Sequence, residues 1–392
     1  MHDVFEYLEW RGDIPFDTLG PVNADYAVFC SLSYVPFDGI VEGFATDGGS
    51  SSKRNISDPG QISGAADATG TGDVIGGFIG LDIAAQKVID IAGQPGHTVR
   101  FHLEDDLKLL ERVKETERFG RIMIGGYKDI FDQKMQEQFC AMTFVLPGGD
   151  AVVAFRGTDG TIIGWKEDFN MGFMDELPSQ KDAVRYLNLA SQMVEGKIYV
   201  CGHSKGGNLA MFAAAFADRA VQDRIVAVRS LDGPGFKKQT VNTPGFLRVI
   251  DRMETFMPQS SIVGLVLEHA ETNHVIHSFA KGSKQHNIYS WSISGGIFTE
   301  EAGLSESSIR ANKAINKWIE KMSDEDRMKL TDGIFELVSQ TEAETLEELF
   351  EPKNLFSVMK KIGKLDDKTK ELIGETGRII MNAYREKSSF SQ

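Results

Sequence analysis

The chain has 392 residues, of which 41% are hydrophobic and 25% charged, so it has ordinary globular composition and enough length for a large core. Its formal net charge is -15, with 57 acidic and 42 basic side chains. This balance argues against nucleic acid as a partner and against broad attachment to anionic membranes, because both depend on clustered Lys and Arg.

The cysteines and the N-terminus favour a cytoplasmic protein. Cys30, Cys140 and Cys201 are few, odd in number and far apart, which indicates a reducing compartment more than a disulfide framework. Residues 1–17 are charged and lack the apolar core of a secretory signal, and no stretch reaches the about 18 apolar residues of a transmembrane helix. We therefore expect no stable membrane insertion.

The first 120 residues are predicted to contain three helices and a flexible insert. A helix with an apolar stripe is expected at 25–34, and a flexible Gly/Ser-rich insert at about 42–77. Residues 78–92 have helical spacing and are read as a core helix, with a lid over a pocket as the alternative. A charged helix follows at 103–117.

Strand-like runs alternate with helical patterns from residue 139 to residue 293. The strands are expected at 139–146, 151–155, 197–201, 225–231, 274–280 and 288–293, and the helices at 181–195 and 207–218. This alternation predicts an α/β fold with a mainly parallel sheet flanked by helices on both faces.

The last hundred residues have a different pattern. Glu, Lys and Leu dominate from Ser305 onward, and Ile315, Trp318, Ile319 and Met322 share one helical face. Further helices are expected at 325–339, 343–351 and 366–386. We expect an α/β domain over 1–300 and a C-terminal α-helical appendage over 301–392.

One motif has the pattern of a nucleophile. The β-branched run at 197–201 leads into Gly202-His203-Ser204-Lys205-Gly206, and an alanine-rich helical pattern follows. Gly202 and Gly206 would allow a sharp strand-to-helix turn with Ser204 at its apex, above a helix N-terminus that favours developing negative charge.

A nucleophilic serine needs a general base, and His286 is the preferred candidate. It lies in a polar loop between the last two strand-like runs, where a base could reach the carboxyl edge of the sheet. A surface histidine is the alternative. His269, His274 and His277 have an uneven spacing that could suggest a metal site, but no second cluster supports one, so neither metal nor cofactor is expected.

The acid that would orient the base is assigned to Asp232. It ends the strand that comes after the helix following Ser204. Its competitors are Asp251, Glu254 and Glu268, and Asp232 could instead simply cap a turn before Gly233. The backbone N–H of Lys205 would supply one oxyanion donor, and the loop at 155–159 the second.

Several motifs in order resemble the class 3, fungal-type lipase branch of the α/β-hydrolases, and more closely the bacterial, lipase-like Mbeg-like family of unknown function. The similarity covers roughly residues 25–300. The residues that carry it are FRGT at 155–158, GWKEDFNM at 164–171, GHSKGGNLA at 202–210, DGPGF at 232–236, PQSSIVG at 258–264 and QHNIYSW at 285–291.

The resemblance implies roles for further residues. Thr158 would be the second oxyanion donor, Asp168 would steady the oxyanion loop, and Trp165 is a further supporting residue. Class 3 lipases have leucine where this chain has Lys205, whose side chain is expected to reach solvent or, as the alternative, to meet an anionic head group. The segment that holds the lipase acid, here residues 255–261, contains no carboxylate.

Two functions follow from these residues. The first is a serine hydrolase that cleaves a small-molecule or lipid ester, with a lysolipid or a thioester as narrower substrates, through an acyl-enzyme on Ser204. The second is a catalytically weak or inactive hydrolase-fold protein that binds a partner. The sequence indicates no oligomeric state.

Overall fold

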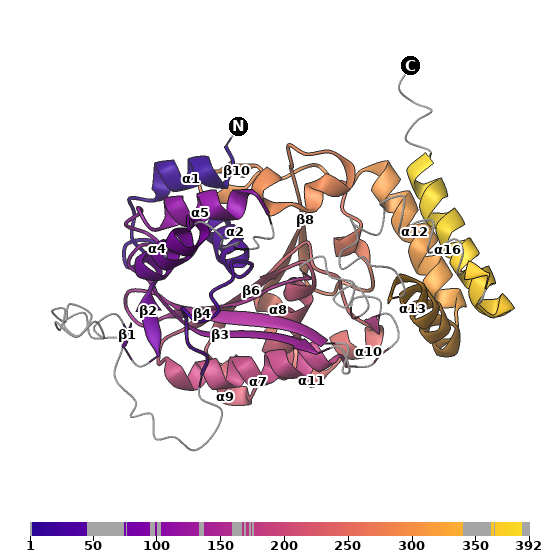
Figure 1. Ribbon diagram of the computed structural model, residues 1–392, viewed down its shortest axis with the longest axis horizontal. Coiled ribbons are helices and arrows are strands. Elements are labelled where there is room, and N and C mark those ends of the chain that lie inside the picture. Colours follow the sequence, from indigo (N-terminus) through magenta and orange to yellow (C-terminus); the bar gives the residue numbers. More distant parts are fainter. Residues whose placement is uncertain are drawn as a thin grey trace.

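The protein is built on one nine-stranded sheet with helices packed on both faces (Figure 1). A computed structural model describes residues 2–44, 74–75, 77–94, 99, 103–132, 137–158, 167, 170–171, 174, 176–339, 362–363 and 365–385. The predicted α/β fold is confirmed.

The strands follow one another across the sheet in chain order, from β1 to β9. They are β1 (Val74–Ile75), β2 (Phe78–Gly80), β3 (Met123–Asp132), β4 (Glu137–Val145), β5 (Ala151–Phe155), β6 (Ile198–His203), β7 (Ile225–Leu231), β8 (Met253–Pro258) and β9 (Thr272–Ile276). The pairs from β1 to β5 are antiparallel, and the pairs from β5 to β9 are parallel. The carboxyl ends of β5 to β9 therefore lie along one edge of the sheet.

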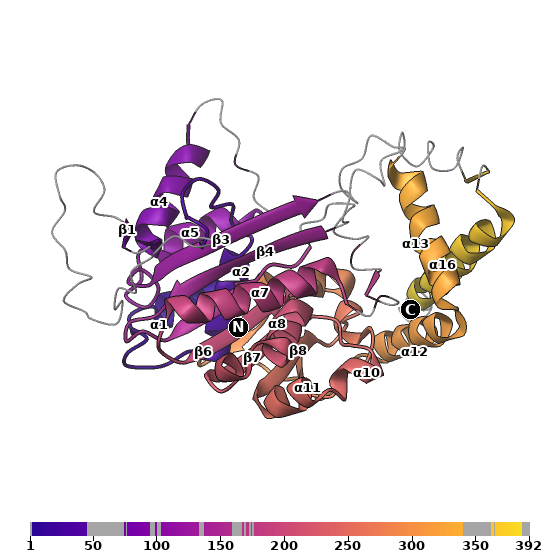
Figure 2. The ribbon, with the colours of Figure 1, turned by 90° about the horizontal axis from the view of Figure 1, so that it is seen from below.

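Each face of the sheet has its own hydrophobic core. Helices α1 (Val4–Arg11), α2 (Asn23–Leu32), α4 (Leu81–Ala92) and α5 (Asp105–Val113) cover one face, and α7 (Pro178–Met193), α8 (Lys205–Phe216) and α11 (Pro244–Val249) cover the other (Figure 2). Strand β5 serves both cores by alternation: Val152 and Ala154 pack in the first, Val153 and Phe155 in the second. Helices thus cover both faces, as predicted.

Shorter elements complete the part of the chain up to residue 298. They are α9 (Arg219–Gln222), α10 (Lys238–Val241), the hairpin of β10 (Ile293–Ser294) and β11 (Ile297–Phe298), and the 3-10 helices η1 (Ile250–Arg252), η2 (Val263–Leu265), η3 (Gly282–His286) and η4 (Ile288–Ser290).

The predicted helix at 78–92 begins later than expected, because residues 78–80 form β2, which pairs with β3. From Leu81 onward it is a core helix, since Leu81, Ala84, Ala85 and Val88 are buried in the first core. The lid alternative does not fit this burial. The insert expected at about 42–77 lies mostly outside the described residues.

The predicted strand at 288–293 is wrong except at Ile293, which begins β10. Residues 288–290 form η4, because the side chain of Asn287 accepts a hydrogen bond from the backbone N–H of Tyr289 and starts a tight turn. The run is apolar because Ile288, Tyr289 and Trp291 are buried in the first core. The strand expected at 274–280 corresponds to β9, which ends at Ile276. Strands β1, β2, β3, β8 and β11 were not predicted.

The C-terminal helices α12 (Glu306–Lys321), α13 (Asp324–Ser339) and α16 (Asp367–Arg385) form a group at one end of the molecule (Figure 1). They share a small apolar cluster that contains Trp318, Met322, Leu330 and Leu372. This agrees with the predicted helices at 325–339 and 366–386, while the helix expected at 343–351 lies outside the described residues.

The three cysteines are buried, free thiols. In the part of the chain that the structure describes, no helix has both the length and the apolar character needed to cross a bilayer.

Candidate active site

Ser204 stands at a strained turn between a strand and a helix. It follows the last residue of β6 and caps α8, with φ 57° and ψ -131°, in the left-handed region that side chains rarely adopt. A Cβ at Gly202 would lie 2.0 Å from the carbonyl oxygen of Gly206, and one at Gly206 would lie 2.1 Å from that of Phe155. Only glycine fits at either position, which explains how the chain turns so sharply at Ser204.

The structure brings His286 and Asp232 together. Nδ1 of His286 lies 2.6 Å from Oδ2 of Asp232, and because a carboxylate only accepts, Nδ1 carries the proton. Asp232 follows β7, is 1% exposed and has a φ of 52°, whereas the His286 side chain at the end of η3 is 32% exposed. The buried acid thus holds a histidine that solvent can reach.

Ser204 lies beside this pair. Its backbone N–H donates to the carbonyl oxygen of Leu231, the residue before Asp232, at 2.9 Å. The ring of His203, which precedes Ser204, lies 4.5 Å from the His286 ring between centroids. Ser204, Asp232 and His286 therefore gather at the carboxyl edge of β6 and β7.

Ser261 is a site residue that the sequence did not reveal. Its Oγ donates to Oδ1 of Asp232 at 2.5 Å, and it accepts from the backbone N–H of Gly264 at 3.0 Å. The neighbouring Ser260 N–H donates to Oε1 of Gln285, next to His286, at 2.8 Å. The segment after β8 corresponds to the one that holds the acid in class 3 lipases. Here it contacts Asp232 on the carboxylate oxygen that does not face His286.

The other acids considered for the site lie elsewhere. Glu254 pairs with Arg229 and His274, and Glu268 forms a backbone bridge with Phe236. The three histidines proposed as alternative metal ligands pair separately with glutamates: His269 with Glu271, His274 with Glu300, and His277 with Glu301. Among the described residues, no group of three or more potential ligands could hold a metal ion.

Tyr34 joins the turn at Ser204 to the loop after β5. Nε2 of His203 lies 2.9 Å from the carbonyl oxygen of His286, so Nε2 carries the proton and Nδ1 accepts from the Tyr34 hydroxyl at 2.9 Å. The same hydroxyl accepts from the backbone N–H of Gly157 at 3.1 Å. The sequence gives no signal for Tyr34, because it lies 123 residues from Gly157.

The loop after β5 lies directly against Ser204. A Cβ at Gly157 would come within 2.9 Å of Cβ of Ser204, and the partly exposed Thr158 follows. Arg156, which precedes them, is held by two hydrogen bonds to the carboxylate of Asp129, at 2.8 and 2.9 Å. Trp165 and Asp168 lie outside the described residues.

The prediction for the Lys205 side chain is wrong, in both of its alternatives. The side chain is fully buried, and its Nζ lies 2.8 Å from Oε2 of Glu167 and 2.8 Å from the carbonyl oxygen of Gln138. Glu167 also accepts from the backbone N–H groups of Gln138 and Ser179. A buried carboxylate needs a cation and donors, and Lys205 supplies that cation instead of reaching solvent.

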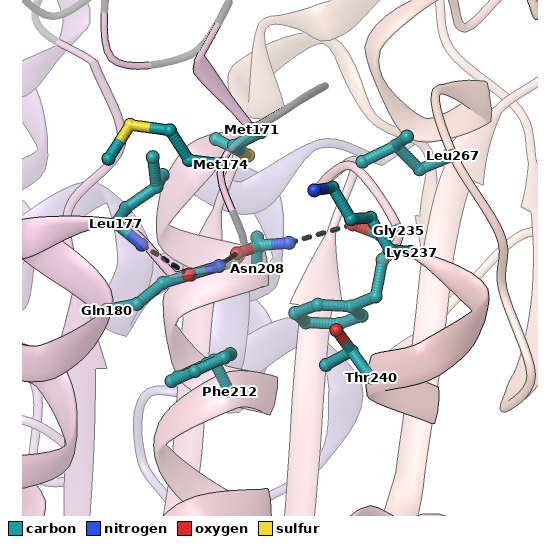
Figure 3. A pocket seen from close by; sticks show the side chains of 11 residues that line it. Met171, Met174, Leu177, Gln180, Asn208, Phe212, Gly235, Lys237, Thr240 and Leu267 are labelled. Atoms are coloured by element: carbon teal, nitrogen blue, oxygen red, sulfur yellow. Dashed lines mark hydrogen bonds between the residues drawn. The ribbon is translucent and has the colours of Figure 1, made fainter. Parts of the chain in front are cut away.

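A small pocket lies one helical turn beyond Ser204 along α8 (Figure 3). Its cavity holds about 20 Å³, and its wall is mixed: Met171, Leu177 and Phe212 line it together with the polar side chains of Gln180, Asn208 and Lys237. The side chain of Asn208 lies between its two sides. Its Oδ1 accepts from Nε2 of Gln180 at 2.8 Å, and its Nδ2 donates to the Gly235 carbonyl oxygen at 2.8 Å. Ser204, Asp232 and His286 do not line this pocket.

The fold and these motifs define a lipase-like α/β protein. The chain belongs to the Mbeg1-like family, whose model matches residues 113–336, more than half of its length. No curated protein matches it significantly.

Two lipases are among the solved structures to which the chain is similar. The propeptide complex of the Rhizomucor miehei lipase is 15% identical, over 40% of this chain and 57% of that chain, with a TM-score of 0.31. The M37 lipase is 18% identical, over 41% of this chain and 61% of that chain, with a TM-score of 0.30. The match thus spans less than two thirds of either lipase, and at these scores it carries no argument about activity.

Proposed function

We propose that the protein is a serine hydrolase that cleaves a carboxylic ester through an acyl-enzyme on Ser204. The contact between His286 Nδ1 and Asp232 Oδ2, beside a serine held at a strained turn, carries this proposal. With Nδ1 protonated and bound to the acid, Nε2 of His286 is the ring atom that can accept a proton from Ser204.

The reaction then has two halves. Ser204 Oγ attacks the acyl carbon while His286 takes its proton, and the resulting tetrahedral intermediate expels the alcohol, which receives that proton. Water, deprotonated by His286, attacks the acyl-enzyme in turn, and the acid product leaves as Ser204 is restored.

The negative charge of each intermediate would be held by two backbone N–H groups. Lys205 donates from the first turn of α8, where the helix N-terminus favours an anion, and Thr158 donates from the loop against Ser204. Tyr34 and the buried pair of Lys205 and Glu167 position these two segments. Lysolipids and thioesters are narrower candidate substrates.

Hydrolysis of p-nitrophenyl esters from acetate to palmitate tests the proposal. We expect turnover by the wild-type protein and its loss, to the background rate, in Ser204→Ala and His286→Ala. His2→Ala is the matched control, because this histidine is exposed and precedes the start of α1. Equal rates for Ser204→Ala and the wild type would favour the alternative, a hydrolase-fold protein that binds a partner.

A further inference from the structure

The segment after β8 is in contact with both the proposed acid and the element that carries the proposed base. Ser261 donates to Asp232, and Ser260 donates to Gln285 in η3, the 3-10 helix that ends at His286. A Cβ at Gly264 would lie 2.4 Å from Oδ1 of Asp232, so the backbone itself approaches the carboxylate closely. We call residues 259–265 the acid platform.

The backbone of the acid platform is held by the start of α12. The N–H of Ser305 donates to the carbonyl oxygen of Gln259 at 2.7 Å. The side chain of Ser308 donates to the carbonyl oxygen of Ser261, and that of Asn312 donates to the carbonyl oxygen of Leu265. Three carbonyl groups of one short segment therefore have donors at or near one helix end.

These donors share one face of α12. Ser308, Asn312 and Asn316 recur every fourth residue, and Asn316 also donates to the carbonyl oxygen of Leu265, at 3.4 Å. Ser308 is 5% exposed although it is polar, because its hydroxyl is used in this contact. A helix attached only by apolar packing would not need such a polar face.

We propose that α12 is a positioning element of the active site, which fixes Asp232, and through it His286, by holding the acid platform. This rests on the proposed function. The C-terminal helical appendage is then part of the hydrolase, and the face of α12 that carries Ser308 and Asn312 acts through Ser261.

The test compares the rate of fluorophosphonate labelling of the full chain and of Ser308→Ala/Asn312→Ala. We expect labelling, and kcat on an ester, to fall at least about 10-fold with KM unchanged and the folded state retained, because small displacements of a catalytic group are costly. Lys313→Ala, an exposed change on the same helix, is the matched control and should label at the wild-type rate. A wild-type rate for the double variant would overturn the inference.

A double-mutant cycle separates positioning from general weakening of the fold. If α12 acts through Asp232, the Ser308→Ala/Asn312→Ala change has no further effect in an Asp232→Asn background. If the double substitution lowers the labelling rate by the same factor in both backgrounds, the proposal is overturned.

Failure of the proposed function is recognised separately. If the wild-type protein is not labelled, or if Ser204→Ala is labelled equally, the hydrolase assignment falls. The contact is then judged by hydrogen–deuterium exchange: faster exchange at 259–265 and 282–286 in the double variant supports the role of α12, and unchanged exchange overturns it.

Discussion

The carboxylate of Asp232 lies 2.6 Å from Nδ1 of His286, which follows it by 54 residues. Its second oxygen accepts from Ser261, so both oxygens of a buried carboxylate have a donor. Such a carboxylate has one orientation, and it fixes both the tautomer and the direction of the imidazole ring.

Replacing this acid tests its role. In Asp232→Asn a neutral amide replaces the carboxylate that accepts from Nδ1–H, so the tautomer and orientation of His286 are no longer fixed. We expect kcat to fall about 10³–10⁴-fold with the fold retained. Glu254→Gln, at a carboxylate paired with Arg229, is the control and should keep the wild-type rate. An unchanged kcat in Asp232→Asn would remove it from the mechanism.

Tyr34→Phe removes one hydroxyl and leaves two polar groups without their partner, the N–H of Gly157 and Nδ1 of His203. Because both flank Ser204, we expect kcat to fall about 10-fold, with KM little changed. Steady-state kinetics on one ester measure this. Tyr199→Phe, at the partly exposed start of β6, serves for comparison, and equal rates for the two variants would contradict a role of Tyr34.

The buried pair of Lys205 and Glu167 predicts a stability effect that depends on which partners are removed. Lys205→Met leaves a buried carboxylate unpaired and should lower the free energy of unfolding by about 3–5 kcal/mol. Lys205→Met/Glu167→Gln removes both charges and should recover most of this loss. Urea denaturation measures the free energy of unfolding of both variants. If Lys205→Met is as stable as the wild type, the pair does not contribute to stability.

Glu137 predicts a pH dependence of stability. Burial, together with the nearby carboxylates of Asp182 and Glu167, raises the pKa of Glu137 from 4.5 to about 7. The folded state therefore binds this proton more tightly than the unfolded state, and the stabilisation present below pH 4.5 is lost as the pH rises towards 7. In Glu137→Gln this loss should disappear, so Tm should fall less between pH 4.5 and pH 8 than in the wild type. An identical fall in both proteins would contradict it.

Local patterns were enough to predict the strands β4 to β7, which are short apolar runs, and the helices α7 and α8, of which α7 is amphipathic and α8 is rich in alanine. Strand β3 was missed because it contains Gly125 and Gly126, and its register shifts between Gly125 and Lys128. The run at 288–293 misled because burial, without a strand, explains its apolar residues.

The proposed catalytic residues could be selected from the sequence because each follows a strand or lies in a polar loop near the same sheet edge. The supporting contacts could not be predicted from the sequence, because they join distant segments. Tyr34 has no local signature. Ser261 and Glu167 lie in motifs of the resemblance, but these motifs do not indicate what either residue contacts, and the burial of Lys205 becomes clear only with Glu167 beside it.

The most direct test of the central claim is the intact mass of the protein after reaction with a fluorophosphonate, followed by peptide mapping of the adduct. We predict one adduct per chain, located on Ser204 and lost in Ser204→Ala, and much slower labelling in His286→Ala. No adduct on the folded wild-type protein, or one on another residue, would contradict it.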